Sequence, residues 1–186
     1  MSRTDWDTRY LDMARLVSTW SKDLKAKVGA VIVRKNRVVA TGFNGLPSDV
    51  LDSEMRLSDQ EMKLNMTVHA EENALLVAGN DAEGACIYVY GKPVCCRCAG
   101  SIIQAGIRRV VAMPPDSKNL DPKSKWYNLG IIARDMFGEA EVAFFGKEIA
   151  ASERVSDLNV PPCDIKGVGS SPRIATSNAI ESDSPA

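Results

Sequence analysis

The spacing of apolar residues predicts a series of helices and strands. A helical repeat at residues 6–20 predicts an amphipathic opening helix that carries Trp6, Tyr10, Met13, Leu16, Val17 and Trp20. Two β-branched segments follow, "KVGAVIVRKN" and "RVVATGFNG", and the Lys35-Asn36 turn between them predicts a β-hairpin. Residues 46–66 are charged and irregular, which indicates a long loop or lid that includes a short helix.

The middle of the chain continues with alternating patterns. Helices are predicted at "HAEENALLVAG", "CRCAGSIIQAG" and "WYNLGIIARDMFGEA", and strands at "ACIYVYG", "IRRVVAM" and "EVAFFG". Such alternation indicates an α/β sheet with helices packed on it. After about residue 150 the chain has no aromatic residue, many serines and four of the nine prolines. Because such a segment cannot bury enough apolar area to offset its ordering entropy, we expect a folded domain at residues 1–149 and a flexible tail at 150–186.

Composition and charge narrow the classes of function. The 186 residues carry a formal net charge of −1 and a pI near 5.9, whereas general binders of nucleic acid or membranes need a basic face. No apolar run approaches the length of a membrane span, and the polar N-terminus "MSRTDWDTRY" is unlike a secretory signal. Three of the five cysteines crowd into four positions, which suits a metal better than a disulfide framework. We therefore expect a protein of the reducing cytoplasm.

The single histidine is the most informative residue. His69 stands two positions before Glu71 at a predicted helix start, and Cys95-x-x-Cys98 follows later in the chain. If Cys98 opens its helix, Cys95 lies on the same side, and helix N-termini favour thiolates. One imidazole and two thiolates select zinc, and three protein ligands leave a fourth position for water, as in catalytic sites. Glu71 is then placed to accept a proton from that water.

Other interpretations of the same residues stay open. A closed structural zinc site would result if Cys86 or Cys96 supplied a fourth ligand, and a lone histidine or C-x-x-C pair is often a structural, surface or redox feature. The joint occurrence of H-x-E and C-x-x-C, in this order and each at a predicted helix start, favours a catalytic zinc. We expect Cys96 to point away from the metal, Cys86 to pack as a small apolar residue, and Cys163 to be a free thiol in the tail.

Five segments extend this pattern over about residues 5 to 148: "SKDLKAKVGAVIV", "ATGFNGLP", "VHAEENAL", "CCRCAGSIIQAGIRRVV" and "ARDMFGEAEV". Together they resemble the motifs of the cytidine and deoxycytidylate deaminase superfamily, and within it the deoxycytidylate (dCMP) branch. The resemblance implies a three-layer α/β/α fold with a central five-stranded mixed sheet. It also implies hydrolytic removal of the 4-amino group of dCMP, which yields dUMP and ammonia in pyrimidine deoxynucleotide metabolism.

The resemblance also implies roles for the residues that match the zinc motifs. His69, Cys95 and Cys98 would hold one zinc ion. Glu71 would move protons between the attacking water, ring N3 and the leaving amine. In the family a proline usually comes directly before the first cysteine of the C-x-x-C motif. In this chain Val94 stands between Pro93 and Cys95, and we expect the zinc site to tolerate this extra residue. This chain has Tyr90 where the family usually has a threonine, and the tyrosine ring either alters the pocket or packs elsewhere.

The substrate contacts are less strongly specified. The backbone N–H of Ala70 is a candidate for the base carbonyl, and Asn44 for the sugar or base, although Asn-Gly is also a common turn. No motif fixes the phosphate. Lys22, Lys25 and Lys27 are candidates, with ordinary surface residues as the alternative.

Regulation and assembly follow from the resemblance alone. "LPSDVLD" lacks the glycine that often follows "GFNG" in allosterically regulated relatives, so control by dCTP and dTTP stays open. Mg2+ bound with an allosteric nucleotide has no support in the sequence. The family implies a homo-oligomer such as a hexamer. We expect a small-molecule deoxynucleotide partner, a cytoplasmic location, and neither membrane nor nucleic acid as a partner.

Two alternative functions stay open. The same chemistry serves a deaminase of another base, nucleoside or modified nucleotide, such as 5-methyl-dCMP, cytosine, guanine or tRNA adenosine. The acidic pI weighs against tRNA. A zinc module without catalysis, acting as an assembly subunit, is the third interpretation. A purely structural site has no use for Glu71 beside an open metal position, which disfavours that function.

Overall fold

A computed structural model describes residues 3–118 and 120–147. In chain order its elements are α1 (Arg3–Ser18), β1 (Gly29–Arg34), β2 (Arg37–Phe43), α2 (Glu54–Ser58), α3 (Gln60–Met66), α4 (Ala70–Ala78), the 3₁₀ turn η1 (Gly79–Ala82), β3 (Cys86–Tyr90), α5 (Cys96–Gln104), β4 (Arg109–Ala112), α6 (Lys125–Glu139) and β5 (Ala143–Gly146). The tail predicted at 150–186, including Cys163, lies outside the described residues. Among the described helices, none combines the length and apolar character needed to span a membrane.

The five strands form one mixed sheet in the order β2-β1-β3-β4-β5. Strand β1 pairs antiparallel with both β2 and β3, whereas β3, β4 and β5 run parallel. Lys35 and Asn36 have φ values of 50° and 60°, which suit the tight turn of the predicted β1–β2 hairpin. The structure thus confirms the prediction of an α/β fold around a five-stranded mixed sheet.

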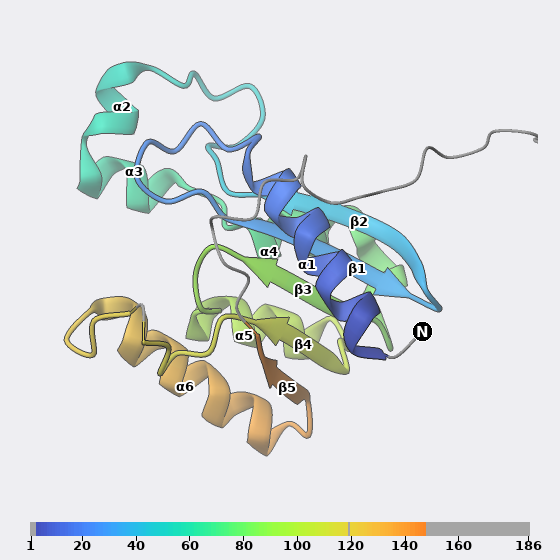
Figure 1. Cartoon of the computed structure of the whole chain (residues 1–186). Helices are drawn as coiled ribbons and strands as arrows, with labels where there is room; N and C mark the ends of the chain where they lie inside the picture. The colour runs from blue at the N-terminus through green and yellow to red at the C-terminus, as the bar shows by residue number, and fades with distance from the viewer. Residues whose placement is uncertain (1–2, 119, 148–186) are drawn as a thin grey trace, which may run out of the picture. The chain divides into compact units, whose positions relative to one another are not determined.

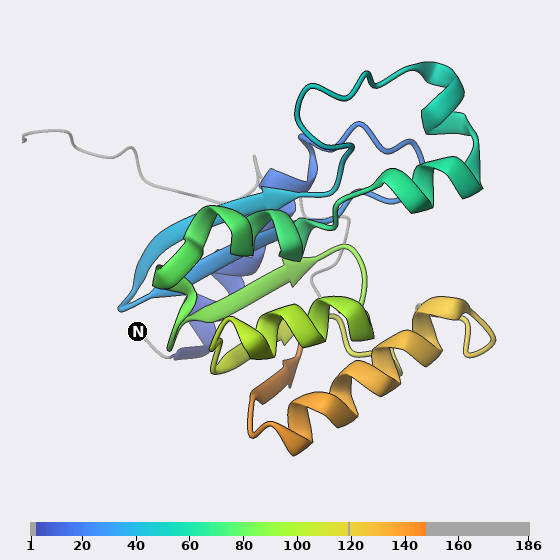
Figure 2. The same ribbon diagram turned by 180° about the vertical axis from the view of Figure 1, so that it is seen from behind.

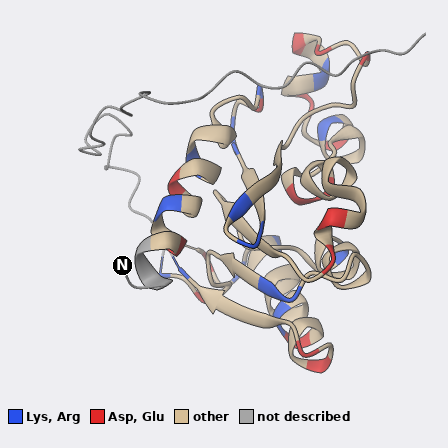
Figure 3. Cartoon of the chain, turned by 90° about the vertical axis from the view of Figure 1, so that its right-hand side faces the viewer, with Lys and Arg blue, Asp and Glu red and all other residues tan. Residues whose placement is uncertain are grey.

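Helices cover both faces of this sheet (Figures 1 and 2). Helix α1 packs on one face, against β1 and β3, while α4, α5 and α6 lie on the other. In Figure 3 the helix that starts beside the N label, α1, stands on one side of the sheet, and basic and acidic residues are interspersed along the helices. The layers therefore follow the predicted α/β/α arrangement.

Alternation along the strands supplies a core on each face. In β1, Val31 and Val33 join the cluster under α1, while Ala30 and Ile32 join the cluster under α4 and α5. Gly42 of β2 lets α4 approach closely, because a Cβ there would overlap the Ala70 carbonyl oxygen and the Ala74 nitrogen. The start of α4 is therefore positioned by direct backbone contact with the sheet.

The opening helix α1 is present, but the prediction of which of its residues form the buried apolar face is partly wrong. Trp6, Met13, Leu16 and Trp20 are all exposed, Trp20 to 53%, and Trp20 lies beyond the helix end. The buried side is built instead from Tyr10, Leu11, Ala14 and Val17. A helical repeat shows that apolar residues can share a side of a helix, whereas the packing of α1 on the sheet decides which stripe is covered.

Residues 46–66, called the arm below, extend beyond the end of the sheet at the top of Figure 1. The arm holds two short helices rather than the one expected. Ser53 accepts a hydrogen bond from the Arg56 amide at the start of α2, and Asp59 accepts one from the Met62 amide at the start of α3. These N-caps explain why a charged, irregular segment forms helices at all.

Candidate active site

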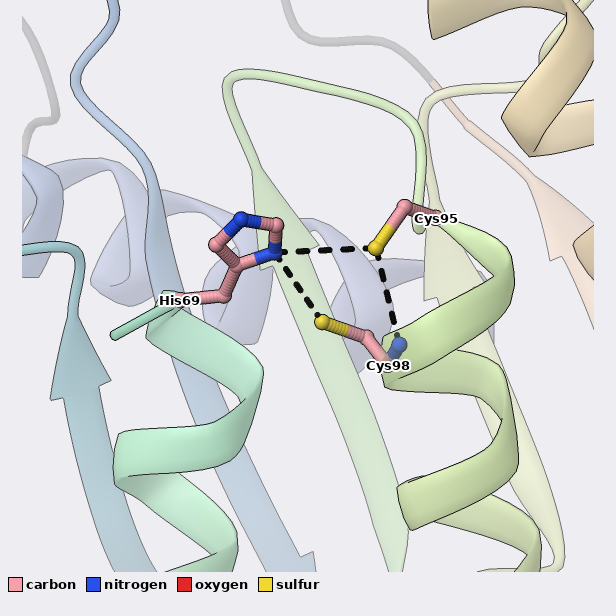
Figure 4. Close-up of side chains that lie close together, drawn as sticks. All are labelled: His69, Cys95 and Cys98. Carbon is pink, nitrogen blue, oxygen red and sulfur yellow. Dashed lines mark hydrogen bonds between the residues drawn. The ribbon is translucent and has the colours of Figure 1, made fainter. Parts of the chain in front are cut away.

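Helices α4 and α5 begin at the same end of the sheet, and the side chains at their starts converge (Figure 4). His69 is the N-cap residue of α4 and Cys95 that of α5. Helix α5 begins at Cys96, as predicted from "CRCAGSIIQAG", so Cys98 lies within the first turn and does not open the helix. Nδ1 of His69 lies 3.2 Å from Sγ of Cys98 and 3.6 Å from Sγ of Cys95.

These three donor atoms fit a zinc ion. Zinc–nitrogen distances of about 2.0–2.1 Å and zinc–sulfur distances of about 2.3 Å place tetrahedral nitrogen and sulfur ligands about 3.6 Å apart. Among the described residues, the only metal-binding group found is His69, Cys95 and Cys98, whose donors all lie within 4.8 Å of one another. Neither Cys86 nor Cys96 joins this group, so the closed four-ligand alternative has no support in the described structure.

The extra residue before Cys95 is accommodated by burial. Val94 is 2% exposed and packs in the core cluster that also contains Cys95 and Cys98, while both sulfurs still lie close to His69. Tyr90 packs against the cluster under α1 on the opposite face of the sheet, and it does not line the pocket described below. Cys86 packs against the same cluster, as expected of a small apolar residue.

The electrostatic environment prepares two groups for chemistry. The hydrogen bond from Cys98 and the neighbouring His69 lower the pKa of Cys95 to about 4 despite its burial, so this sulfur is a thiolate at neutral pH, the form that binds metals. Burial raises the pKa of Glu71 to about 7. A carboxyl group with such a pKa can both accept and return a proton near neutral pH.

Glu71 is buried in the first turn of α4, next to His69, with 4% of its surface exposed. It lines the same pocket as His69, which is the position expected of a proton-transfer group. We refer to His69, Glu71, Cys95 and Cys98 together as the metal corner.

An ion pair that no sequence motif predicts joins the two helix starts. Oε2 of Glu72 accepts a hydrogen bond from the His69 amide at 3.2 Å, and another from Nη2 of Arg97 at 3.2 Å. Glu72 thus caps α4 and ties it to the first turn of α5. The cap has a sequence signal, a glutamate three residues after the N-cap, but the pairing with Arg97 has none.

A pocket opens beside the metal corner. Besides His69 and Glu71, its lining includes Ala26 and Val28 from the loop at residues 19–28, Lys63 and Leu64 at the end of the arm, Thr67 just after it, and Pro93 and Trp126. The Trp126 ring centroid lies 6.1 Å from that of His69. The arrangement offers an apolar slot with a metal site and a proton carrier at one end.

The pocket receives only some of the predicted substrate contacts. Asn44, Ala70 and Lys25 line it, whereas Lys22 and Lys27 are not among its lining residues. Instead, Lys22 Nζ pairs with Asp52 of the arm at 2.7 Å, and Lys27 is exposed. Sequence reasoning did not select the lining residues Lys63, Lys92 and Trp126, because none belongs to a recognisable motif.

The Asn44 side chain fastens the loop beside the pocket. Oδ1 of Asn44 accepts from the Val28 amide at 2.8 Å, and Nδ2 donates to the Ala26 carbonyl at 2.9 Å. Since an amide side chain has two donors and two acceptor sites, one of each is left for other contacts.

Comparisons with known proteins agree with this geometry. Residues 4–114 match the family model of the cytidine and deoxycytidylate deaminase zinc-binding region. An uncharacterized deaminase in the luxG 3′ region of Aliivibrio fischeri is 44% identical over 137 residues, which are 74% of this chain and 90% of that protein. The matched region includes His69, Cys95 and Cys98, which confirms the prediction of a zinc cofactor.

Two further relatives extend the comparison. The deoxycytidylate deaminase of Schizosaccharomyces pombe is 38% identical over 120 residues, which are 59% of this chain but 37% of that protein, so the match spans well under half of the yeast enzyme. The dCMP deaminase of cyanophage S-TIM5, solved in complex with dCMP and dUMP, superposes with a TM-score of 0.61 at 22% identity. That match covers 79% of this chain and 100% of the phage chain, and it shows a shared fold.

Proposed function

This chain belongs to the cytidine and deoxycytidylate deaminase family, and we propose that it hydrolyses dCMP to dUMP and ammonia. The observation that carries this proposal is the metal corner, in which Glu71 lies beside three zinc donors at the end of a pocket. The deoxycytidylate deaminase identity of the yeast relative supports dCMP as the substrate.

The residues of the metal corner divide the chemistry between them. His69, Cys95 and Cys98 would hold the zinc ion, which polarises the attacking water when bound. Glu71 accepts a proton from this water and donates one to ring N3 as the oxygen adds to C4. It then takes the proton of the new hydroxyl on C4 and delivers it to the amine, which leaves as the C4–N bond breaks and the C4 carbonyl forms. Water and dCMP are consumed, and dUMP and ammonia are formed.

Two groups are suited to hold the nucleoside. The Ala70 amide is in the first turn of α4, where backbone N–H groups lack intrahelical partners, so it can donate to the carbonyl of the base. Asn44 keeps one donor and one acceptor after bracing the loop, and these can bind a sugar hydroxyl or the base.

The phosphate is best assigned to Lys25 and Lys92. Both line the pocket, and within residues 3–118 and 120–147 neither ammonium group makes a hydrogen bond or an ion pair. Two free ammonium groups suit a phosphate monoester, which is nearly doubly charged at neutral pH. Lys22, by contrast, already has a carboxylate partner in Asp52.

An ammonia-release assay tests the proposed substrate. The zinc-loaded protein is offered dCMP, deoxycytidine, CMP, 5-methyl-dCMP, cytosine, guanine and adenosine. We expect turnover of the deoxynucleotides, with dCMP preferred. Activity on a free base or nucleoside instead would keep the zinc chemistry and reject dCMP. Silence on every compound, despite bound zinc, would favour a non-catalytic zinc module.

Glu71→Gln is the matched blank for this assay. It keeps the shape of the side chain but cannot carry the proton, so we expect turnover to fall about 10²- to 10⁴-fold while zinc content and the circular dichroism spectrum stay unchanged. Glu139→Gln, at the exposed end of α6, serves as the control and should keep full activity. Activity retained by Glu71→Gln would remove Glu71 from the mechanism.

The expected homo-oligomer is also a proposal. A hexamer would have about six times the 20.2 kDa mass of one chain, which light scattering during size-exclusion chromatography measures directly. A monomeric mass would reject it.

A further inference from the structure

One wall of the pocket is formed by two segments without strands. The loop at residues 19–28 and the arm at residues 46–66 lie side by side at the same end of the sheet (Figures 1 and 2). We call these two segments together the pocket wall. Lys63 of the arm and Asp23 of the loop form an ion pair, with Nζ 3.0 Å from Oδ1. Their side chains are only 7% and 10% exposed, and both residues line the pocket.

Asp23 also determines the conformation of its own loop. The Asp23 Oδ1 that binds Lys63 accepts hydrogen bonds from the Lys25 amide at 2.8 Å and the Ala26 amide at 3.0 Å. Burial raises the pKa of Asp23, but these three hydrogen bonds outweigh it and lower the pKa below its ordinary value. Asp23 is therefore ionised at neutral pH and holds the arm and the loop through one oxygen.

The loop side of this contact continues to Asn44. Ser21 Oγ accepts from the Asp23 amide at 3.2 Å and donates to the Asn44 carbonyl at 2.7 Å. The Asn44 side chain in turn binds Ala26 and Val28. A continuous set of hydrogen bonds therefore runs from Lys63 through the loop to Asn44, the residue proposed to hold the nucleoside.

Stability alone does not account for a pair at this place. Burying two charges is costly, and an apolar pair of similar volume is often equally stable or more so. A second pair, Lys22 with Asp52, joins the same two segments at 2.7 Å, but its side chains are 70% and 29% exposed. Exposed pairs of that kind contribute little. The buried pair differs in being fixed by further hydrogen bonds and in lining the pocket.

We propose that the Lys63–Asp23 ion pair is a positioning element for the substrate, which couples the arm to the loop so that Lys25 and Asn44 keep a fixed distance from the metal corner. Lys63 acts through the position of the wall and not on the reacting atoms. This inference takes only the identity of the substrate from the proposed function.

Four variants separate positioning from simple destabilisation. Lys63→Met keeps the length of the side chain and leaves Asp23 bonded to two backbone amides, while Asp23→Asn removes the other charge. The double variant Asp23→Asn/Lys63→Met leaves neither charge buried without a partner. Asp52→Asn is the matched control, because it removes the charge from the exposed pair that joins the same two segments.

We expect both single variants to raise KM for the nucleotide by at least about tenfold, with kcat within about threefold of the parent and zinc content unchanged. Both should also lower the melting temperature, because each leaves a buried charge unpaired. In the double variant the melting temperature recovers while KM stays raised. A KM that recovers together with the melting temperature would overturn the proposal, and so would an equal rise of KM in Asp52→Asn.

A measurement without substrate keeps this inference separate from the proposed function. In hydrogen exchange, Lys63→Met should speed the exchange of amides in both the arm and the loop, whereas Asp52→Asn should leave both near the parental rates. Faster exchange in the arm alone would reject the coupling. If no compound of the panel is turned over but both segments respond, the dCMP proposal fails and the coupling of the pocket wall stands.

Discussion

Residues of the metal corner and of the pocket wall line one pocket, yet different forces position them. The corner is carried by α4 and α5, which rest on the sheet through an apolar core and the close contact at Gly42. The wall contains no strand and is joined across its two segments by the Lys63–Asp23 and Lys22–Asp52 pairs. Apolar packing therefore supports the corner, with Glu72 and Arg97 joining its two helix starts, whereas ion pairs and hydrogen bonds join the two segments of the wall.

In the proposed function, this difference assigns catalysis to the corner and substrate binding to the wall. A close-packed support keeps metal donors in place without further adjustment, as a tetrahedral site requires. A wall held by polar contacts can be altered at single charged residues without disturbing the sheet. Variants of the corner should therefore abolish turnover, and variants of the wall residues that line the pocket should change affinity for the substrate.

The largest expected effect comes from removing a metal donor. Cys98→Ala deletes one of the two sulfurs, so zinc should fall from about one ion per chain to near none, and ammonia release should be lost. Elemental analysis of the purified protein measures the zinc. Cys96→Ala is the control, because Cys96 lies between the two ligands in sequence but outside the donor group. Normal zinc content in Cys98→Ala would contradict the assigned ligand set.

A smaller effect should follow when charge is removed beside the pocket. Lys25→Met or Lys92→Met should each raise KM for dCMP about 10- to 100-fold, since a hydrogen bond to a charged group contributes about 1.5–3 kcal/mol. Steady-state kinetics on dCMP and deoxycytidine make the test, and only the phosphorylated substrate should be affected. Lys123→Met, an exposed lysine before α6, should change neither. An equal loss on both substrates would exclude a phosphate contact.

Adding one methyl group at Gly42 tests the close contact between β2 and α4 that supports the metal corner. Gly42→Ala would overlap the α4 backbone, so we expect a loss of about 1–3 kcal/mol in the free energy of unfolding, with a smaller loss of zinc affinity. Gly138→Ala is the opposite case, because a Cβ at this helical position meets nothing within 4 Å. That variant should be neutral or slightly more stable. Urea denaturation compares the two, and equal stabilities would contradict the close contact between β2 and α4.

The smallest effect on activity is expected from the opposite face of the sheet. Asp7 pairs with Arg109 through Oδ2 and Nη2 at 2.7 Å and accepts from Tyr88 at 2.9 Å. Burial raises the pKa of Asp7, but the contacts with Arg109 and Tyr88 outweigh burial and lower it below its ordinary 3.8. This carboxylate therefore contributes stability that is complete above the unfolded pKa and is lost as pH falls through the folded value.

Asp7→Asn tests this linkage. In urea denaturation at neutral pH, the free energy of unfolding of the variant should be lower than that of the parent by about 1–3 kcal/mol. Its stability should also depend less on pH below about pH 4. Ammonia release at neutral pH should match the parent. Unchanged pH dependence would show that Asp7 has no lowered pKa, and a large loss of turnover would place this cluster in the mechanism.

Local patterns predicted most of the fold and the metal corner. The hairpin follows from two β-branched runs around Lys35-Asn36, and the α/β sheet from the alternation of strands and helices. The motifs H-x-E and C-x-x-C identified the three zinc donors and Glu71. They are readable from sequence because the two residues of each motif lie within one turn of a helix start. The start of α5 at Cys96 agrees with the predicted segment, and the structure adds that Cys95 is its N-cap and that Cys98 lies in its first turn.

Local sequence patterns therefore predict the features that depend on neighbours within a few positions, which are the helices and strands, the hairpin turn and the H-x-E and C-x-x-C pairs. The tertiary structure alone decided which side of α1 is covered, that Glu72 meets Arg97, and that Lys63 meets Asp23 across 40 positions. Such polar pairs have no periodic signature, because any lysine and any carboxylate attract each other. The folded sheet decides which of them come within reach, and so builds the pocket wall beside the metal corner.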